Sequence, residues 1–281
     1  MHFTAEDLNR TRIAEGADPL WETVLSLHRL RDSRTEPALA AWRQHAARHG
    51  PGPLRRLLPL VPPRGYFPDF LTPVAGAAGV EPGLEAVMTT PRRRLRSEIG
   101  LLAGQSQRSG HGQHAAPDSW MRSLADGEPA ALRALARSLR TYHHTALGPG
   151  WPLIGRRVEA DRTLRQHALR QEGAEAMLRT FGPAMRWRRP VLEVAYPRDG
   201  DLRLEGRGLL LVPSYFCTDP VTLADTELPP VLVYPAAPLA GAGPAERDRP
   251  GHAEGLRLRT YGSGALRGFQ TRFGSLTGTR F

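Results

Sequence analysis

The sequence predicts an α+β fold: a mainly helical N-terminal two-thirds with a long helical hairpin, followed by a small and mostly antiparallel β-sheet. Three observations support this prediction. Apolar residues recur at helical spacing as far as about residue 181, they recur at every second position from residue 191, and two later apolar runs are continuous and end at prolines. Helices that come first and strands that come later are typical of the α+β class.

The helices of the first half are recognised by the signals at their N-termini. Thr4 and Asp7 form an acidic variant of the capping box, and Asp18 is an N-cap residue that precedes Pro19 at the first helical position. The helix that starts at Pro19 has apolar residues over a broad face and should lie in the core. We expect helices over residues 5–9, from 19, over 37–49, 54–60 and 84–88, and from 91, with an extended segment over 10–13.

Two longer helices are predicted next, at about 128–147 and 152–181. The breaker Gly148-Pro149-Gly150 separates them. Each has an apolar stripe on one side, and long helices joined by a short connection usually pack antiparallel. We therefore expect a helical hairpin.

The strands are predicted after the hairpin. Residues 191–196 alternate between the two faces of a strand, and Leu202 and Leu204 alternate with charged residues. The runs 209–212 and 231–234 are continuously apolar, as in strands that are buried on both faces.

The chain divides into two parts by composition. Residues 1–238 are predicted to form one α+β domain, with a sub-boundary in the polar linker 104–118. Residues 239–281 contain nine glycines among 43 residues and show no sustained helical or strand period. We expect this Gly- and Arg-rich tail to be poorly ordered.

The positive charge is concentrated in the middle of the chain. All 38 basic residues are arginines, as in proteins from GC-rich genomes, so the total charge does not by itself indicate nucleic-acid binding. Residues 91–190 hold 18 arginines against 8 acidic residues, which accounts for the whole excess of +10. This region is either a solvated helical surface or a surface for nucleic acid, an anionic ligand or an acidic partner.

Four arginines stand in the first turn of the helix predicted from residue 91, at positions 92, 93, 94 and 96. Cations at a helix N-terminus oppose the macrodipole, at a cost of roughly 0.3 to 1 kcal/mol each. Either these side chains extend into solvent or an anion compensates them.

The single cysteine, Cys217, excludes an internal disulfide and a zinc site made of thiolates. Residues 1–12 contain Glu6 and Asp7 where a signal peptide needs an apolar run, and no apolar run reaches membrane length. We expect a cytoplasmic protein that does not associate with membranes.

The candidate site is the segment 57–73, LLPLVPPRGYFPDFLTP, in which two prolines make a rigid bend before three aromatic residues. One interpretation is that the aromatic side chains fill a seam between two helical layers. The other is that they form one wall of an apolar pocket for a small molecule, with Arg64 and Asp69 as polar contacts.

Other chemical motifs are weak. His111 and His114 have a gap suitable for metal ligands, but no nearby residue completes a set. Cys217, Ser214 and Asp219 are close in sequence, but no positioned base is evident. We expect no cofactor, no metal and no recognisable catalytic residue.

Several blocks of the chain resemble a known family. They are FTAEDLNRTRIAEGADPLWETVLSLHRLRD, LVPPRGYFPDFLTP, ADGEPAALRALARSLRTYH and GRGLLLVPSYFC followed by PVTLADTELPPVLVYP. Together they resemble an actinobacterial group of ArsR-like winged-helix transcriptional regulators, in which an N-terminal domain of unknown function precedes a C-terminal winged helix.

The resemblance implies that residues 1–238 are an effector-sensing and dimerisation body that binds a small apolar or aromatic metabolite. Where that group has its winged helix, this chain has the tail 239–281, so DNA binding by the usual recognition helix is not expected. The expected partners are a small-molecule ligand and a second copy of the chain. The residues expected to bind the ligand are Trp21, Arg64, Tyr66, Phe67, Asp69, Phe70, Tyr142, His143 and Trp151.

The alternative is a ligand-binding protein or enzyme of specialised metabolism derived from such a regulator. It would catalyse a cyclisation or rearrangement by holding a flexible substrate in a reactive conformation, which needs no acid, base or metal.

Overall fold

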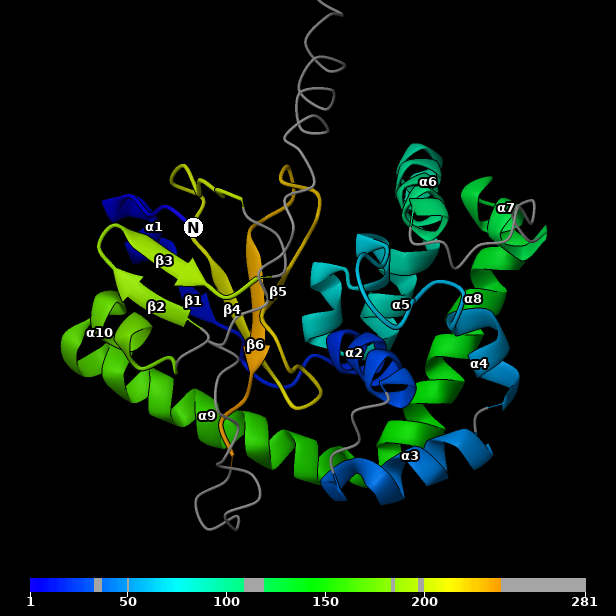
Figure 1. Cartoon of the computed structure of the whole chain (residues 1–281), viewed down its shortest axis with the longest axis horizontal. Helices are drawn as coiled ribbons and strands as arrows, with labels where there is room; N and C mark the ends of the chain where they lie inside the picture. The colour runs from blue at the N-terminus through cyan, green and yellow to red at the C-terminus, as the bar shows by residue number, and fades with distance from the viewer. Residues whose placement is uncertain (33–36, 50, 109–118, 183–184, 197–199, 239–281) are drawn as a thin grey trace, which may run out of the picture. The chain divides into compact units, whose positions relative to one another are not determined.

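The computed structural model describes residues 1–32, 37–49, 51–108, 119–182, 185–196 and 200–238 (Figure 1). These residues belong to one compact unit, Met1–Arg247. They form an α+β fold, with the helices concentrated in the first two-thirds and the strands after them. The predicted tail 239–281 and residues 109–118 of the predicted linker lie outside the described residues.

The helices begin largely where their N-terminal signals predict. The Thr4 hydroxyl accepts a hydrogen bond from the Asp7 backbone N–H at 3.2 Å, and the Thr4 N–H donates to the Asp7 carboxylate at 2.8 Å, which completes the capping box. Asp18 caps its helix by accepting from the N–H groups of Leu20 and Trp21. The helices are α1 Ala5–Arg10, α2 Pro19–Arg31, α3 Pro37–His49, α4 Pro51–Leu57, α5 Val80–Met88, α6 Arg92–Arg108, α7 Ser119–Ala125, α8 Pro129–Tyr142, α9 Trp151–Glu172 and α10 Ala174–Arg179. None of the described helices has the length and apolar character needed to cross a membrane.

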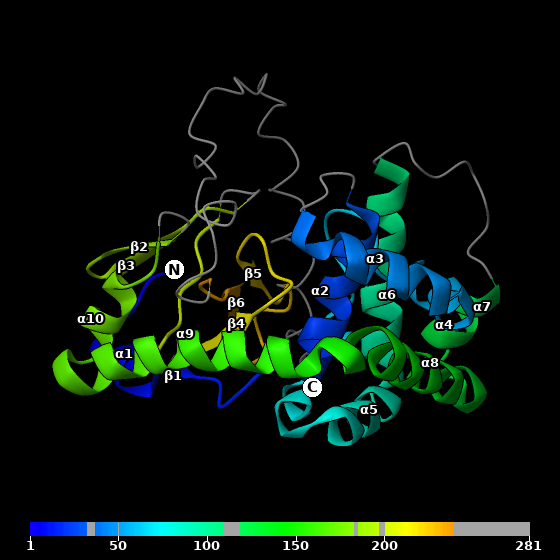
Figure 2. The ribbon, with the colours of Figure 1, turned by 90° about the horizontal axis from the view of Figure 1, so that it is seen from below.

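The prediction of a helical hairpin was wrong. α8 continues through a π-helical turn, His143–Leu147, and a 3-10 turn, Gly148–Gly150, directly into α9. The Gly148-Pro149-Gly150 segment does not interrupt the helical path, because Gly148 keeps helical backbone angles and a proline is tolerated in the first turn of a helix. α8 packs on α4 and α5, whereas α9 packs on α10 and on the strands (Figure 2).

The π-helical turn is held by side chains of α3. The indole N–H of Trp42 donates to the carbonyl oxygen of Ala146 at 2.9 Å, and Nε2 of His45 lies 2.8 Å from the carbonyl oxygen of Thr145. A π turn shifts the ladder of backbone hydrogen bonds by one residue, so some of its carbonyl groups need other partners. α3 supplies these partners.

The prediction of a mostly antiparallel sheet was also wrong. The main sheet has the order β1-β4-β6-β5, with β1 (Arg12–Ile13), β4 (Leu210–Ser214) and β6 (Val231–Pro235) parallel and β5 (Val221–Thr222) antiparallel to β6. The segment that contains β5 returns the chain between β4 and β6, so both of these strands run the same way. A separate antiparallel pair consists of β2 (Met185–Arg188) and β3 (Val191–Val194).

The continuous apolar character of β4 and β6 follows from their burial on both faces, as the sequence predicted. Val212 and Val233 face the core of the helical part, while their neighbours Leu211 and Leu232 face a second core formed with α10 and the β2–β3 pair. The main sheet therefore lies between two hydrophobic cores.

The arginines at the start of α6 are compensated by the protein's own carboxylates. Arg92 and Arg96 both contact one carboxylate oxygen of Asp126, at 2.8 and 2.7 Å. Arg94 pairs with Glu98 one helical turn later, at 2.5 Å. Three of the four arginines are thus paired with carboxylates of the protein itself, and the fourth, Arg93, is exposed to solvent.

Asp161 of α9 holds the end of β6. Its buried carboxylate accepts hydrogen bonds from the Tyr234 hydroxyl at 2.7 Å, the Ala237 N–H at 3.1 Å and the guanidinium of Arg165 at 3.0 Å. Arg165 is also buried and lies over the ring of Phe181, with 4.6 Å to the ring centroid.

We predict that Asp161→Ala lowers the free energy of unfolding by about 3 to 5 kcal/mol, because it leaves the Arg165 guanidinium buried without its counter-charge. Urea unfolding measures this change. The matched control is Glu159→Ala on the same helix, which removes an exposed pair with Arg162 and should cost about 1 kcal/mol or less. Equal losses in the two variants would contradict the prediction.

Candidate functional site

The segment 57–73, called here the aromatic loop, is fastened to α6 by Gln105. The side chain of Gln105 accepts a hydrogen bond from the Tyr66 N–H at 2.7 Å and donates one to the Arg64 carbonyl oxygen at 3.1 Å. Gly65 lies between them with φ +91°, and a Cβ atom there would stand 2.2 Å from the Gln105 amide nitrogen. Both the positive φ and this close approach require glycine at position 65.

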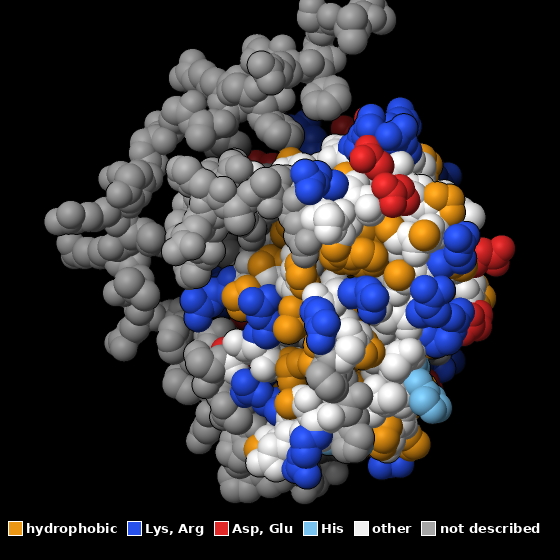
Figure 3. Space-filling view, turned by 90° about the vertical axis from the view of Figure 1, so that its right-hand side faces the viewer, with side chains coloured by type: hydrophobic (Ala, Val, Ile, Leu, Met, Phe, Trp, Pro, Cys, Tyr) orange, Lys and Arg blue, Asp and Glu red, His pale blue; other side chains and the backbone are white. Residues whose placement is uncertain are grey.

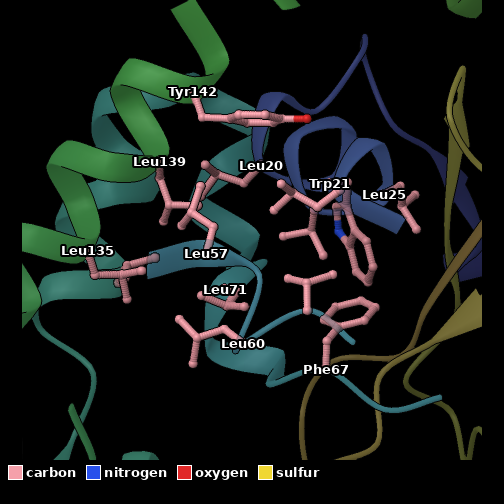
Figure 4. Packing of buried hydrophobic residues seen from close by; sticks show 14 of the residues in the cluster. Leu20, Trp21, Leu25, Leu57, Leu60, Phe67, Leu71, Leu135, Leu139 and Tyr142 are labelled. Carbon is pink, nitrogen blue, oxygen red and sulfur yellow. The ribbon is translucent and has the colours of Figure 1, made fainter. Parts of the chain in front are cut away.

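The aromatic side chains of the loop are packed into the core of the helical part. Phe70 is fully buried, and the Phe67 ring lies edge-on to Trp21 with 6.0 Å between centroids (Figure 4). The Phe67 ring also contacts the ring of His28, with 5.4 Å between centroids. Burial lowers the pKa of His28 to about 4. These contacts are those expected of a seam between layers.

Tyr66 differs from the two phenylalanines of the loop. Its hydroxyl oxygen is buried and has no hydrogen-bond partner among the described residues. Burial raises the pKa of Tyr66, and the neighbouring carboxylates of Glu98 and Asp69 raise it further, so the hydroxyl stays protonated. The Asp69 backbone N–H and the Arg94 guanidinium act in the opposite direction but offset only part of the rise. A buried hydroxyl without a partner costs free energy, which a partner of suitable shape would recover.

Two buried carboxylates flank this hydroxyl. Asp69 accepts hydrogen bonds from the N–H groups of Ala224 and Asp225, both at 2.9 Å, and burial raises the pKa of Asp69 to about 6. Glu98 of α6 accepts from the Phe70 N–H at 2.8 Å. The loop is therefore held from α6 on one side and from the segment after β5 on the other.

The remaining predicted site residues form a second group at the end of α8. The buried hydroxyl of Tyr142 lies 3.1 Å from the Ser26 hydroxyl, and the His143 ring lies edge-on to Trp151 with 4.8 Å between centroids. Nε2 of His143 is buried and has no partner among the described residues, and burial lowers the pKa of this histidine.

The nine predicted residues thus fall into two groups on opposite faces of α2, which contributes Trp21 to one and Ser26 to the other. In Figure 4 Phe67 faces Trp21, while Tyr142 lies at the other end of the cluster. Arg64 is exposed, and its carbonyl group rather than its guanidinium takes part in the loop contacts.

The sequence analysis missed Glu22, which lies in α2 and is fully buried. Its carboxylate accepts hydrogen bonds from the Ser214 hydroxyl at 3.0 Å and from the N–H groups of Tyr215 and Phe216 at 2.7 and 3.2 Å. Burial raises the pKa of Glu22 to about 7. A signal was present, because a glutamate that stands between Trp21 and Val24 near the start of a helix with a broad apolar face is expected to be buried with partners.

The side chains at the end of β4 and just after it make hydrogen bonds that stabilise the fold, and none of these bonds activates a nucleophile. Ser214 donates its hydroxyl hydrogen to Glu22 and accepts from the Cys217 N–H. The Cys217 thiol donates to the carbonyl oxygen of Asp219, and burial raises the pKa of the thiol well above its ordinary value. The described residues contain no group of three side chains able to hold a metal ion, and His111 and His114 lie outside them.

We predict that the free energy of unfolding falls by about 1 to 2 kcal/mol as the pH rises from 5.5 to 8. At the lower end of this window the folded protein holds a proton on Glu22, whose pKa is raised to about 7, while the unfolded chain has released it, and the folded protein loses this proton as the pH rises through about 7. Stability is therefore lost with rising pH. The raised pKa values of Asp18 and Asp69, both about 6, also make stability fall with rising pH, but at lower pH than Glu22 does. The lowered pKa of His28, about 4, makes stability rise with pH in that lower range.

Glu22→Gln tests the assignment, because an amide does not titrate. Its single oxygen can accept only one of the two backbone hydrogen bonds, which reach different oxygens of Glu22, so the variant should be less stable at every pH and is judged by its pH dependence alone. Unfolding by urea at a series of pH values should show most of the fall removed in this variant. The control Glu85→Gln, at an exposed position, should leave the fall in stability with pH unchanged. A fall that persists in Glu22→Gln would show that another group titrates.

The chain matches no known protein-family model, no curated protein and no solved structure. Its function must be inferred from its own residues, chiefly the aromatic loop, the carboxylates that hold it and the arginines on the helices.

Proposed function

We propose that the chain is the effector-sensing and dimerisation body of an ArsR-like transcriptional regulator, and that it binds a small apolar or aromatic molecule at the aromatic loop. The observation that carries this proposal is the buried Tyr66 hydroxyl without a partner. It supplies a polar recognition atom beside the buried aromatic side chains of the loop, and a small-molecule site usually combines an apolar wall with a few polar groups. Reading of DNA by a winged helix is not part of the proposal.

The contacts of the aromatic loop suit a sensor. The loop touches α2 through Phe67, α6 through Gln105, and the segment after β5 through Asp69. A molecule that inserts beside Tyr66 displaces side chains that hold the helical part to the sheet. Binding would thus be coupled to the contacts between these two parts, as an effector response requires.

The experiment uses simple aromatic probes with one hydrogen-bonding group, indole and phenol, and measures the midpoint of thermal unfolding of the full chain. We expect both probes to raise the midpoint by a few degrees and Tyr66→Phe to remove most of the increase. The variant alone should be as stable as the original protein, because it loses a hydroxyl that has no partner. Tyr196→Phe, at an exposed tyrosine, is the control and should keep the increase. No increase with either probe, or an equal one in Tyr66→Phe, would reject this site.

Dimerisation is supported by two exposed leucines on α9. Leu153 and Leu164 are 41% and 51% exposed. They are eleven positions apart, which is about three helical turns, so they lie on the same side of the helix. Exposed apolar residues aligned on one helix face are common at interfaces between helices.

We predict that the chain is a dimer in solution and that Leu153→Asp with Leu164→Asp makes it a monomer. Light scattering after size-exclusion chromatography measures the mass. Val74→Asp is the control, because Val74 is similarly exposed but lies outside α9. A monomeric original protein, or a dimer that persists in the double variant, would contradict the prediction.

A further inference from the structure

Four helices that pack together carry a charge equal to that of the whole chain. α4, α6, α7 and α8 contain eleven arginines and a single acidic residue, Glu98. The complete chain has a net charge of +10. α4 and α7 both pack on α8, and α7 also packs on α6. The excess charge is therefore collected in one region of the fold.

Only part of this charge is compensated by the protein. Asp126 contacts both Arg92 and Arg96 but balances only one of their two charges, Glu98 pairs with Arg94, and Glu81 of α5 pairs with Arg140. Six other arginines of these helices are exposed and form no ion pair with the described residues: Arg55, Arg56, Arg93, Arg122, Arg133 and Arg137. We call these six the arginine face.

The view toward these helices shows basic side chains spread over the surface between apolar ones, with acidic side chains at its upper and right margins (Figure 3). On α8, Arg133 and Arg137 are one helical turn apart, about 6 Å along the axis, and both are exposed. Arg133 and Arg137 thus form a short row on one rigid helix, and the other four arginines of the face lie on α4, α6 and α7.

We propose that the arginine face binds the phosphate backbone of a nucleic acid without regard to its sequence. The guanidinium group presents its N–H donors in a flat fork that fits two oxygens of a phosphate, and it remains charged at every relevant pH. A row of cations on a rigid helix fits a linear polyanion with evenly spaced charges. Binding is driven by the release of counterions from the nucleic acid and needs no contact with base edges.

A protein partner fits this surface less well. Specific protein interfaces use both signs of charge to fix the orientation of the partner. The six arginines have no acidic residue among them in these helices except Glu98, which is buried. An acidic protein surface is the competing occupant that the experiment must exclude.

The test is the fluorescence anisotropy of two labelled 20-base-pair duplexes of unrelated sequence, titrated with the full chain at several NaCl concentrations. We expect similar affinities for both duplexes and a linear fall of log K with log salt. Arg133→Gln with Arg137→Gln should reduce the slope by about two, since each lost phosphate contact lowers it by about one. Affinity at low salt should fall at least tenfold.

The matched control removes the same charge from outside the four helices. Arg12→Gln with Arg186→Gln changes two exposed arginines of the strands and should leave the slope unchanged. An unchanged slope in the α8 variant overturns the proposal, and it is also the result expected if residues 239–281 bind the duplex instead. An equal reduction of the slope in the control variant overturns it as well. Poly-glutamate that competes as well as an equal charge of duplex overturns it in favour of an acidic protein. This outcome is independent of whether indole or phenol binds at Tyr66.

Discussion

Buried carboxylates that accept hydrogen bonds from distant backbone N–H groups hold this structure together. Glu22 reaches the end of β4, Asp69 reaches the segment after β5, and Asp161 reaches the end of β6. Asp7 does the same at Gly208, just before β4. Each bond joins a helix or the aromatic loop to the sheet region, and each carboxylate would be costly to bury without it. The position of the helices relative to the strands follows from these bonds.

The carboxyl ends of parallel strands usually offer backbone N–H groups to a bound anion. Here the protein's own side chains take these groups, with Glu22 at β4 and Asp161 at β6. These N–H groups are therefore not available to a phosphate or carboxylate ligand at the carboxyl ends of β4 and β6. Ser214, the last residue of β4, and Cys217, which follows the strand, serve as structural hydrogen-bond partners in this arrangement.

Local signals in the sequence predicted local structure well. The capping box at Thr4, the N-cap at Asp18 and the apolar runs of β4 and β6 depend on neighbours in the chain, and they were recognised. Strand direction and the path of α8 and α9 depend on what packs against them, and they were predicted wrongly. For the candidate site, the rigid aromatic loop was visible in its prolines and aromatics. The partners of Asp69 are more than 150 residues away, and no local pattern could identify them.

The π-helical turn between α8 and α9 makes the length of this stretch critical. Each residue advances a helix by about 100°, so removing one residue from His143–Leu147 would rotate the whole of α9 by that angle. Asp161 would then point away from Tyr234, and Ala146 and Thr145 would leave Trp42 and His45 without acceptors. The exposed position His144 can accept other side chains, but a deletion anywhere in the turn changes the direction of α9. The length of this turn is therefore a stronger constraint than the residue type at its exposed position.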